Sequence, residues 1–318
     1  MLAAIFFLLL GLGLLILGAE WLVRGASSLS RKAGISELAI GLTVVAFGTS
    51  MPELIVNIFA ALRGSADIGI GNVIGSNTFN ILLILGIAAL VRPLTIQKST
   101  VWKEIPFALL AVLLVLVMGN DAFFDEAPFN GLTRTDGLAL MSFFVIFIYY
   151  IFGMSKVNHD GGEPVKLYSY PLSIGLVTLG IGGLFLGGKI VVDNAVVIAR
   201  LGGLSESLIG LTIVAAGTSL PELVTSIVAA IHRRYDISIG NIVGSNIFNI
   251  FWVLGLTSTL LPLPFNPIVN FDVLVSLGAS LLLFFGIMVG KKYRLGRAEG
   301  FFFLLMYAGY LTYLIQRG

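Results

Sequence analysis

Two stretches of the chain decide its fold: they read GLTVVAFGTSMPELIVNIFAALRGSADIGIGNVIGSNTFN at residues 41–80 and GLTIVAAGTSLPELVTSIVAAIHRRYDISIGNIVGSNIFN at residues 210–249. They align without a gap at an offset of 169 residues and are identical at 24 of 40 positions. A shared apolar composition alone would give about six identities. The identical positions include polar residues, which a membrane-like composition does not supply, so the chain carries an internal repeat.

The composition around this repeat is that of a membrane protein. Of 318 residues, 57% are apolar and 11% are charged, with a mean hydropathy of +1.01. This excludes an ordinary soluble domain and makes the lipid bilayer the expected partner. The net charge is +2, and the basic residues are dispersed between apolar runs, so no nucleic acid is expected as a partner. The sequence contains no cysteine, so cysteine usage does not indicate the redox compartment.

The apolar runs predict an all-α integral membrane fold of ten transmembrane helices. Residues 2–23 are read as the first span, because no basic segment precedes them and no cleavage site follows. The predicted spans are 2–23, 37–62, 68–91, 104–119, 131–153, 170–192, 206–231, 237–261, 270–290 and 298–315. We expect a first repeat at 1–152, a cytoplasmic linker at 153–169 and a second repeat at 170–318.

Five spans separate equivalent positions of the two copies. Because five is odd, the second copy enters the membrane from the opposite face, and the repeats have inverted topology. Of the 19 Lys and Arg residues, 14 fall in the loops after the odd-numbered spans and four on the opposite side. The positive-inside rule therefore predicts a multi-pass cell-membrane protein with both termini outside.

The repeated motifs GTSMPE (48–53) and GTSLPE (217–222) lie within apolar spans. Proline has no N–H, so Pro52 leaves the carbonyl of Gly48 without its helical partner and crowds that turn. Pro221 has the same effect in the second copy. The motifs therefore predict two broken helices whose irregular backbone lines a polar cavity.

Each motif ends in a carboxylate at membrane depth, Glu53 and Glu222. Charged groups there are costly, so a functional role is the default, and inverted repeats place substrate sites at the repeat interface near the midplane. Ser76 lies four residues before Asn80, as Ser245 does before Asn249. All these groups are hard oxygen donors, and no Cys or His lies in a span, so the pattern disfavours soft transition metals.

An oxygen count favours Ca²⁺ as the cation. Two bidentate glutamates supply four oxygens, and the carbonyls of Thr49 and Thr218 would make six, within the range that Ca²⁺ takes. When the cation leaves, two neighbouring carboxylates cannot both stay ionised cheaply, so Na⁺ or H⁺ must replace it. This substitution is the physical basis of antiport.

The paired G-T-S-x-P-E and G-N-x-x-G-S-N motifs resemble those of the cation/Ca²⁺ exchanger superfamily, in particular a prokaryotic member of its Na⁺/Ca²⁺ exchanger branch. The resemblance implies that Glu53 and Glu222 bind Ca²⁺ with the carbonyls of Thr49 and Thr218, while Asn80 and Asn249 complete the centre. It also implies sliding of the first and sixth spans during alternating access. The resemblance assigns Na⁺ binding to Ser50, Ser219, Ser76, Ser245 and the backbone of Ala46 and Ala215.

One position departs from the family pattern. Many members have aspartate where this chain has Asn249, so the site is less negative, which argues against a K⁺ site. The G-N-x-x-E-H type signature of the proton-coupled branch is absent, which favours Na⁺ over H⁺ as the exchanged ion.

The leading alternative to Na⁺/Ca²⁺ exchange is H⁺/Ca²⁺ antiport on the same fold. A channel and an intramembrane hydrolase are less favoured, because a channel has no need of inverted repeats and no span carries a His base. We therefore expect a transporter, not an enzyme, that works as a monomer without a cofactor and carries Ca²⁺ and Na⁺, with H⁺ as a competitor.

Overall fold

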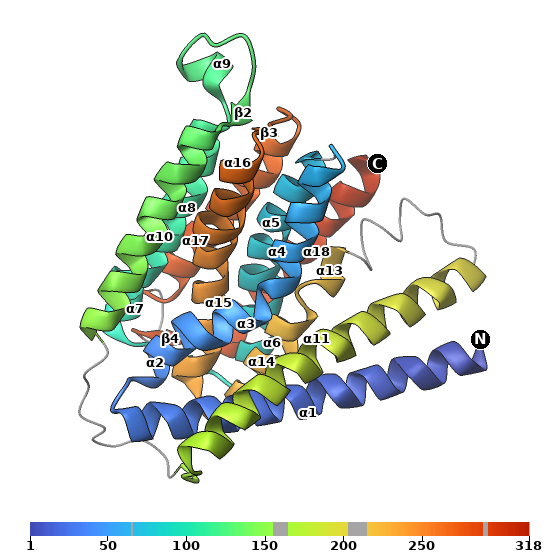
Figure 1. Cartoon of the computed structure of the whole chain (residues 1–318), viewed down its shortest axis with the longest axis vertical. Helices are drawn as coiled ribbons and strands as arrows, with labels where there is room; N and C mark the ends of the chain where they lie inside the picture. The colour runs from blue at the N-terminus through green and yellow to red at the C-terminus, as the bar shows by residue number, and fades with distance from the viewer. Residues whose placement is uncertain (65, 155–164, 203–214, 289–291, 318) are drawn as a thin grey trace.

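The chain folds into a helical membrane bundle (Figure 1). The computed structural model describes residues 1–64, 66–154, 165–202, 215–288 and 292–317. Within these residues, eight helices are long and apolar enough to cross a membrane, and a pair bent by 44° makes a ninth crossing. The predicted span at 206–231 is described only from residue 215 onward, and most of the predicted linker lies outside the described residues.

The two halves have corresponding helices. The first half contains α1 (Leu2–Ala33), α2 (Glu37–Ile40), π-helix η1 (Gly41–Val45), α3 (Ala46–Thr49), α4 (Met51–Leu62), α5 (Ala66–Phe79), π-helix η2 (Asn80–Ile84), α6 (Leu85–Val91), α7 (Lys98–Trp102), α8 (Glu104–Met118), α9 (Asp121–Phe124) and α10 (Arg134–Met154). The second half contains α11 (Tyr170–Leu201), α13 (Ala215–Gly217), α14 (Leu220–Ile231), α15 (Tyr235–Ile247), π-helix η4 (Phe248–Leu254), α16 (Gly255–Leu260), α17 (Val269–Gly286) and α18 (Arg297–Arg317).

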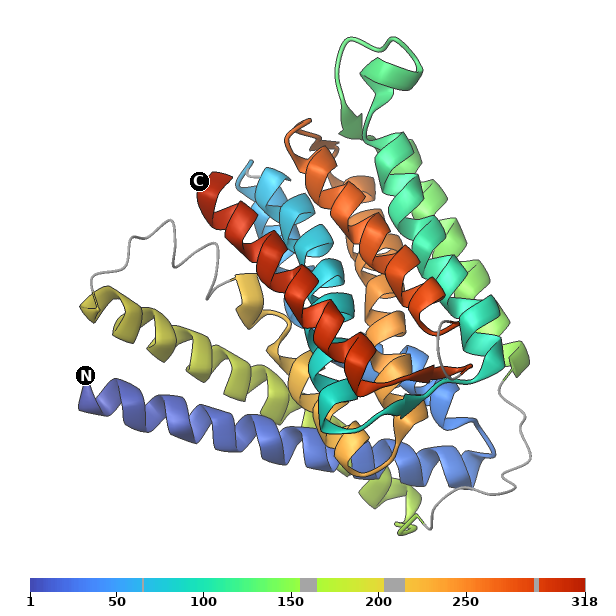
Figure 2. The same cartoon turned by 180° about the vertical axis from the view of Figure 1, so that it is seen from behind.

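The predicted ends of the first and sixth spans were wrong. α1 continues to Ala33 and α11 to Leu201, about ten residues beyond the expected ends, so residues 24–33 are helical and not a loop. A helix of 32 residues is about 48 Å long, whereas the hydrocarbon core is about 30 Å thick. The excess length is accommodated by tilt, and both helices cross the bundle obliquely in Figures 1 and 2.

Helices α1 and α11 pack as an antiparallel pair through backbone contacts at glycines. A Cβ atom added at Gly18 would lie 2.7 Å from the amide nitrogen of Leu184, and one added at Gly180 would lie 2.6 Å from that of Leu22. One added at Gly25 would lie 2.8 Å from the carbonyl of Ser173. Larger side chains at these positions would push the two helices apart.

Two short antiparallel sheets join the repeats at opposite ends of the bundle. Strand β1 (Leu94–Thr95) pairs with β4 (Arg294–Leu295), and β2 (Gly131–Leu132) pairs with β3 (Leu263–Pro264). In each sheet, the loop after the third span of one repeat meets the loop between the fourth and fifth spans of the other. This exchange is what inverted repeats require, and Figure 1 shows β2 with β3 at one end and β4 at the other.

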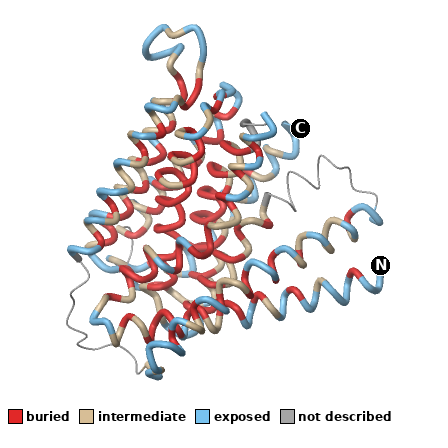
Figure 3. Tube along the Cα trace, in the orientation of Figure 1, coloured by how far each residue is buried: buried red, intermediate tan, exposed pale blue. Residues whose placement is uncertain are grey.

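The centre of the bundle is formed by the third span of each repeat. Every residue from Ile237 to Ile247 of α15 is buried, and the central helices are the most continuously buried part of the trace in Figure 3. Many of these buried residues are polar, which a membrane protein tolerates where the groups are paired or line a cavity. We therefore expect the functional site at this centre.

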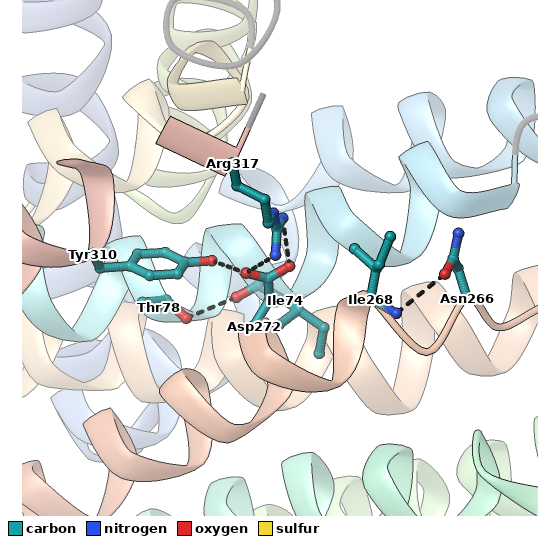
Figure 4. A network of polar contacts seen from close by, with 7 residues as sticks. All are labelled: Ile74, Thr78, Asn266, Ile268, Asp272, Tyr310 and Arg317. Carbon is teal, nitrogen blue, oxygen red and sulfur yellow. Dashed lines mark hydrogen bonds and ion pairs between the residues drawn. The ribbon is translucent and has the colours of Figure 1, made fainter. Parts of the chain in front are cut away.

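Helices α17 and α18 are clamped together away from this centre. Asp272 accepts a hydrogen bond from the Tyr310 hydroxyl at 2.9 Å and two from the Arg317 guanidinium at 3.1 and 2.9 Å (Figure 4). A bidentate arginine–carboxylate pair fixes orientation as well as distance. The last turn of α18 is thus tied to the first turn of α17.

Candidate cation site

Each repeat has a broken helix at its G-T-S-x-P-E motif, which confirms the break predicted from the prolines. In the first repeat α3 ends at Thr49, and Ser50 at the break has φ −86° and ψ 7°. In the second repeat α13 ends at Gly217, and Ser219 has φ −91° and ψ 6°. The proline and the glutamate of each motif then lie in the first turn of α4 or α14, where the helix dipole favours a negative charge.

Glu53 is fully buried and held by serines from both repeats. Its Oε1 atom accepts hydrogen bonds from Ser76 of α5 at 3.1 Å and from Ser219 of the second repeat at 3.2 Å. The two serine hydroxyls also contact each other at 2.8 Å. The carboxylate of one repeat is therefore oriented partly by the broken helix of the other.

Glu222 is held in the same way with the repeats exchanged. It is fully buried, and its Oε1 atom accepts from Ser50 of the first repeat at 3.0 Å and from Ser245 of α15 at 3.2 Å. Each carboxylate therefore belongs to a polar network that crosses the repeat interface. In the described part of the chain, no group of three or more Asp, Glu, His or Cys side chains forms a metal cluster.

Among the described residues, four buried oxygen atoms of the predicted site glutamates and asparagines have no hydrogen-bond partner. They are the Oε2 atoms of Glu53 and Glu222 and the Oδ1 atoms of Asn80 and Asn249. Glu53 corresponds to Glu222 and Asn80 to Asn249 at the 169-residue offset, so the four form two symmetry-related pairs. Buried acceptors without a donor carry a desolvation penalty that a cation or proton removes.

Two further asparagines orient the amides of this set. Asn80 donates through Nδ2 to Asn246 Oδ1 at 2.9 Å, and Asn249 donates through Nδ2 to Asn77 Oδ1 at 3.0 Å. Asn77 and Asn246 in turn donate to each other's backbone carbonyls at 3.1 and 3.4 Å. With their amide nitrogens engaged in this way, Asn80 and Asn249 present oxygen atoms as the remaining polar groups.

The threonine side chains contact the opposite repeat. Thr49 Oγ1 donates to Asn241 Oδ1 at 2.9 Å, and Thr218 Oγ1 donates to Asn72 Oδ1 at 3.3 Å. These contacts hold the broken segments against α15 and α5. Binding of a cation by the threonine carbonyls remains a prediction.

Ala46 and Ala215, predicted to bind Na⁺ through their backbone, are the first residues of the short helices α3 and α13. The carbonyl of Ala46 accepts from the backbone N–H of Ser50 at 2.9 Å and from Thr49 Oγ1 at 3.3 Å. Both lone pairs of this oxygen are therefore engaged, and Na⁺ could bind there only after one bond breaks. Ala215 begins α13, and its side chain lies outside the described part of the structure.

Departures from regular α-helix surround the site. Residues Gly41–Val45 before the first break are π-helical, as are Asn80–Ile84 and Phe248–Leu254 in the third spans. Asn80 is the first residue of η2, and Asn249 is the second of η4. Such wide turns alter the carbonyl pattern of a helix and occur often at functional sites.

Four residues in this network were not predicted as site residues. They are Asn72, Asn77, Asn241 and Asn246. The sequence does mark these four asparagines, because they are identical in the two copies of the motif G-N-x-x-G-S-N. Their role as orienting amides depends on contacts between helices that a single sequence does not display.

The comparisons with known proteins agree with this architecture. The family model of the sodium/calcium exchanger protein matches residues 3–153 and again 172–316. The inner membrane protein YrbG of Escherichia coli is 37% identical over 286 residues, which cover 84% of this chain and 82% of the relative. The sodium/calcium exchanger MaX1 of Methanosarcina acetivorans is 32% identical over 305 residues, covering 84% and 85%.

The fold is also that of a solved exchanger. A structure of the sodium-calcium exchanger NCX_Mj, soaked with 2.5 mM Na⁺ and 0.1 mM Ca²⁺, superposes with a TM-score of 0.83 at 33% identity and covers 98% of both chains. The similarity of fold therefore extends over nearly the whole length of both chains. The chain belongs to the sodium/calcium exchanger family of membrane transporters.

Proposed function

We propose that this transporter exchanges Ca²⁺ for Na⁺ by alternating access at a site between the two repeats. The observation that carries the proposal is the set of four unpartnered oxygens on Glu53, Glu222, Asn80 and Asn249. They are acceptors in a fully buried setting, which suits a hard cation. Two carboxylates neutralise one divalent ion.

The same charge count explains why the ion must be exchanged. An empty site would leave two buried carboxylates uncompensated, which is unfavourable. Na⁺ ions fill the site on the return step in this proposal, as the related exchangers' names say of those proteins. A proton on each carboxylate would satisfy the same atoms, so H⁺/Ca²⁺ antiport is the alternative that the experiment must separate.

Different groups are proposed for the two ions. The carboxylates of Glu53 and Glu222, with the carbonyls of Thr49 and Thr218 and the oxygens of the two asparagines, would reach the six to eight ligands that Ca²⁺ takes. The hydroxyls that now donate to the carboxylates can turn their oxygens to Na⁺. The proposed Na⁺ ligands are Ser50, Ser219, Ser76, Ser245 and the backbone of Ala46 and Ala215.

The proposed setting is the cell membrane, with both termini outside and the protein active as a monomer. The Lys and Arg distribution supports this orientation. The Escherichia coli relative is named an inner membrane protein. Cysteine labelling at the two termini in intact cells tests the orientation.

The test of function is Ca²⁺ flux in proteoliposomes with an imposed Na⁺ gradient, an imposed H⁺ gradient, or neither. We expect outward Na⁺ gradients to drive Ca²⁺ uptake. Glu222→Gln and Glu53→Gln should each reduce uptake below about a tenth of the parent rate, because each removes one of two neutralising charges. Asp193→Asn is the control, since Asp193 is an exposed carboxylate paired with Lys189.

Two outcomes would overturn the proposal. Uptake driven by the H⁺ gradient alone would replace Na⁺ with H⁺ as the coupling ion. Full transport in a folded Glu222→Gln protein would remove the site assignment altogether. Size-exclusion chromatography and thermal unfolding establish that each variant is folded.

A further inference from the structure

Helix α1 is joined to the end of α14 by a polar contact between residues far apart in the sequence. Glu20 of α1 contacts His232 Nε2 at 2.6 Å and Arg24 Nη2 of its own helix at 2.9 Å. His232 directly follows α14. A histidine with a proton on Nε2 donates to the carboxylate in its neutral and in its charged form. The contact therefore holds α1 against α14 in either protonation state.

Helix α1 lies against the central bundle without being part of it. Its buried side chains, such as Leu15 and Leu22, pack with Val228 of α14 in a hydrophobic cluster separate from the main one. In its most apolar stretch 28% of the residues are buried, against 94% for the span Tyr235–Leu260. Figure 3 shows exposed and intermediate residues along much of α1. A helix with few buried contacts can shift at low cost.

The two broken helices are not covered equally. In the second repeat α14 is covered by α1, and the equivalent cover for α4 would be α11. Helix α11 instead packs against α3, α13 and α14, and Figure 1 shows α1 and α11 at the end of the bundle where α14 lies. As a result, Val228 of α14 is 7% exposed, whereas the equivalent Phe59 of α4 is 55% exposed.

The charges at equivalent positions give a physical reason for this difference. At the 169-residue offset, the three residues of the contact correspond to three residues with different charges: Glu20 to Lys189, Arg24 to Asp193, and His232 to Arg63. An acidic residue thus faces a histidine at the end of α14, whereas a lysine would face an arginine at the end of α4. Lys189 pairs with Asp193 of its own helix at 2.8 Å. Because like charges repel, the equivalent contact at α4 is unfavourable.

We propose that Glu20 and His232 form a latch that closes the α14 side of the cation site, and that the exchanger is biased toward this state because the α4 side lacks an equivalent latch. The inference rests on the alternating access proposed above. Both residues lie outside the cation-site network and act by positioning α1. A partly exposed pair of this kind changes an equilibrium by about two- to fivefold. The Lys and Arg distribution predicts that the closed side faces the cytoplasm.

Thiol labelling measures the bias. The chain contains no cysteine, so a single Val228→Cys substitution reports on the contact between α1 and α14. Detergent-purified protein is treated with a dilute, water-soluble methanethiosulfonate reagent, and the labelled fraction is followed by mass spectrometry. At low reagent concentration the rate follows the population in which α1 has left α14. We expect Glu20→Gln and His232→Ala each to label about two- to fivefold faster than the parent.

Further variants assign the effect to the latch. His232→Gln should keep a rate close to that of the parent, because its amide N–H replaces the ring N–H as a donor. The double variant of Glu20→Gln and His232→Ala should label no faster than either single variant, since both break one contact. Glu126→Gln makes the same chemical change in the loop after α9 and should leave the rate unchanged.

Lys189→Glu tests the asymmetry between the two sides. It gives α11 a carboxylate that would face Arg63 when α11 lies along α4, so the opposite state gains a latch. Labelling at Val228→Cys should therefore be accelerated in Lys189→Glu as well, although this change lies on the other helix. An unchanged rate in Lys189→Glu would overturn the charge explanation of the bias.

Three other outcomes would overturn the latch. The first is an unchanged labelling rate in folded Glu20→Gln protein. The second is an equal acceleration at Val112→Cys, a buried position of α8 in the main cluster, which would indicate general loosening. The third is His232→Gln behaving like His232→Ala. Ca²⁺ flux separates this proposal from that of exchange: normal Na⁺-driven flux with unchanged labelling removes only the latch, and absent Na⁺-driven flux in the parent removes only Na⁺/Ca²⁺ exchange.

Discussion

Replacing Asn249 by aspartate tests the charge count of the site. The Nδ2 atom of Asn249 donates to Ser76 Oγ at 3.3 Å, and that hydroxyl donates to Glu53 Oε1 at 3.1 Å. These two contacts place the position of the new charge within about 6.4 Å of the Glu53 carboxylate. In Asn249→Asp, a third carboxylate therefore enters a site that holds two.

The size of the effect follows from this distance. At an effective dielectric constant of about 20, two unit charges 6.4 Å apart repel by about 2.6 kcal/mol. This energy corresponds to about two pH units of proton competition. Acid inhibition of Ca²⁺ flux should therefore begin about two pH units higher in Asn249→Asp than in the parent protein. A new dependence on K⁺ or altered Na⁺ cooperativity is expected for the same reason.

The control is Asn249→Ala, which loses the same hydrogen bonds without adding a charge. Both variants leave Asn77 Oδ1 without its donor, so both should lose about 1–3 kcal/mol of stability. Only the aspartate should shift the pH profile. Ca²⁺ flux in proteoliposomes between pH 5 and 9, with and without K⁺, gives both readouts on folded protein. An identical pH profile for all three proteins, or strict K⁺ dependence of the parent, would refute the charge argument.

Three further predictions follow from the same structure. In the parent protein, acid should inhibit transport competitively with Ca²⁺, because protons and Ca²⁺ share the two carboxylates; an apparent Ca²⁺ affinity that is constant between about pH 5 and 8 contradicts this. Gly18→Ala should lower the unfolding midpoint and the exchange rate, because its methyl group would meet the Leu184 amide at 2.7 Å, whereas Gly13→Ala has open space and should be neutral. Arg317→Gln should lower the free energy of unfolding by about 1–3 kcal/mol, since it leaves the buried Asp272 carboxylate without its cation. Lys189→Gln breaks the exposed pair with Asp193 and should lower it by under about 1 kcal/mol. Equal losses in the two variants would refute the role of burial.

Much of the fold could be predicted because the two copies of the repeat are closely similar in sequence. The 169-residue offset implies that Glu53 and Glu222 are equivalent, and the prolines after Thr49 and Thr218 predict where the helices break. Each of these signals is local or is a comparison of the chain with itself. None requires knowledge of which helix packs against which.

The missed features depend on geometry that no local pattern encodes. The ends of α1 and α11 were misread, because a tilted helix that extends past the hydrocarbon core can carry polar residues such as Arg24 and Asp193. The π-helical turns were not predicted, since one extra residue per turn leaves an apolar sequence looking the same. The serine bonds to Glu53 and Glu222 cross between repeats and exist only once the two broken helices meet.

The hydrogen bonds beside the two glutamates differ between the repeats. In the second repeat, Asn241 of α15 donates to the carbonyl of Glu222 at 3.3 Å and to Ser226 at 2.9 Å, which ties α14 to α15 beside the carboxylate. In the first repeat, Asn57 replaces the serine and donates to the carbonyl of its own helix, Glu53, at 3.0 Å.

The amide nitrogen of the equivalent Asn72 then has no partner in the described structure, and neither has Asn57 Oδ1. At this level α4 is therefore held to α5 less firmly than α14 is to α15, although the four unpartnered oxygens of the proposed cation site are supplied symmetrically. Because the proposed alternating-access site must open along contacts that separate at low cost, the α4–α5 contact is the one we expect to separate first.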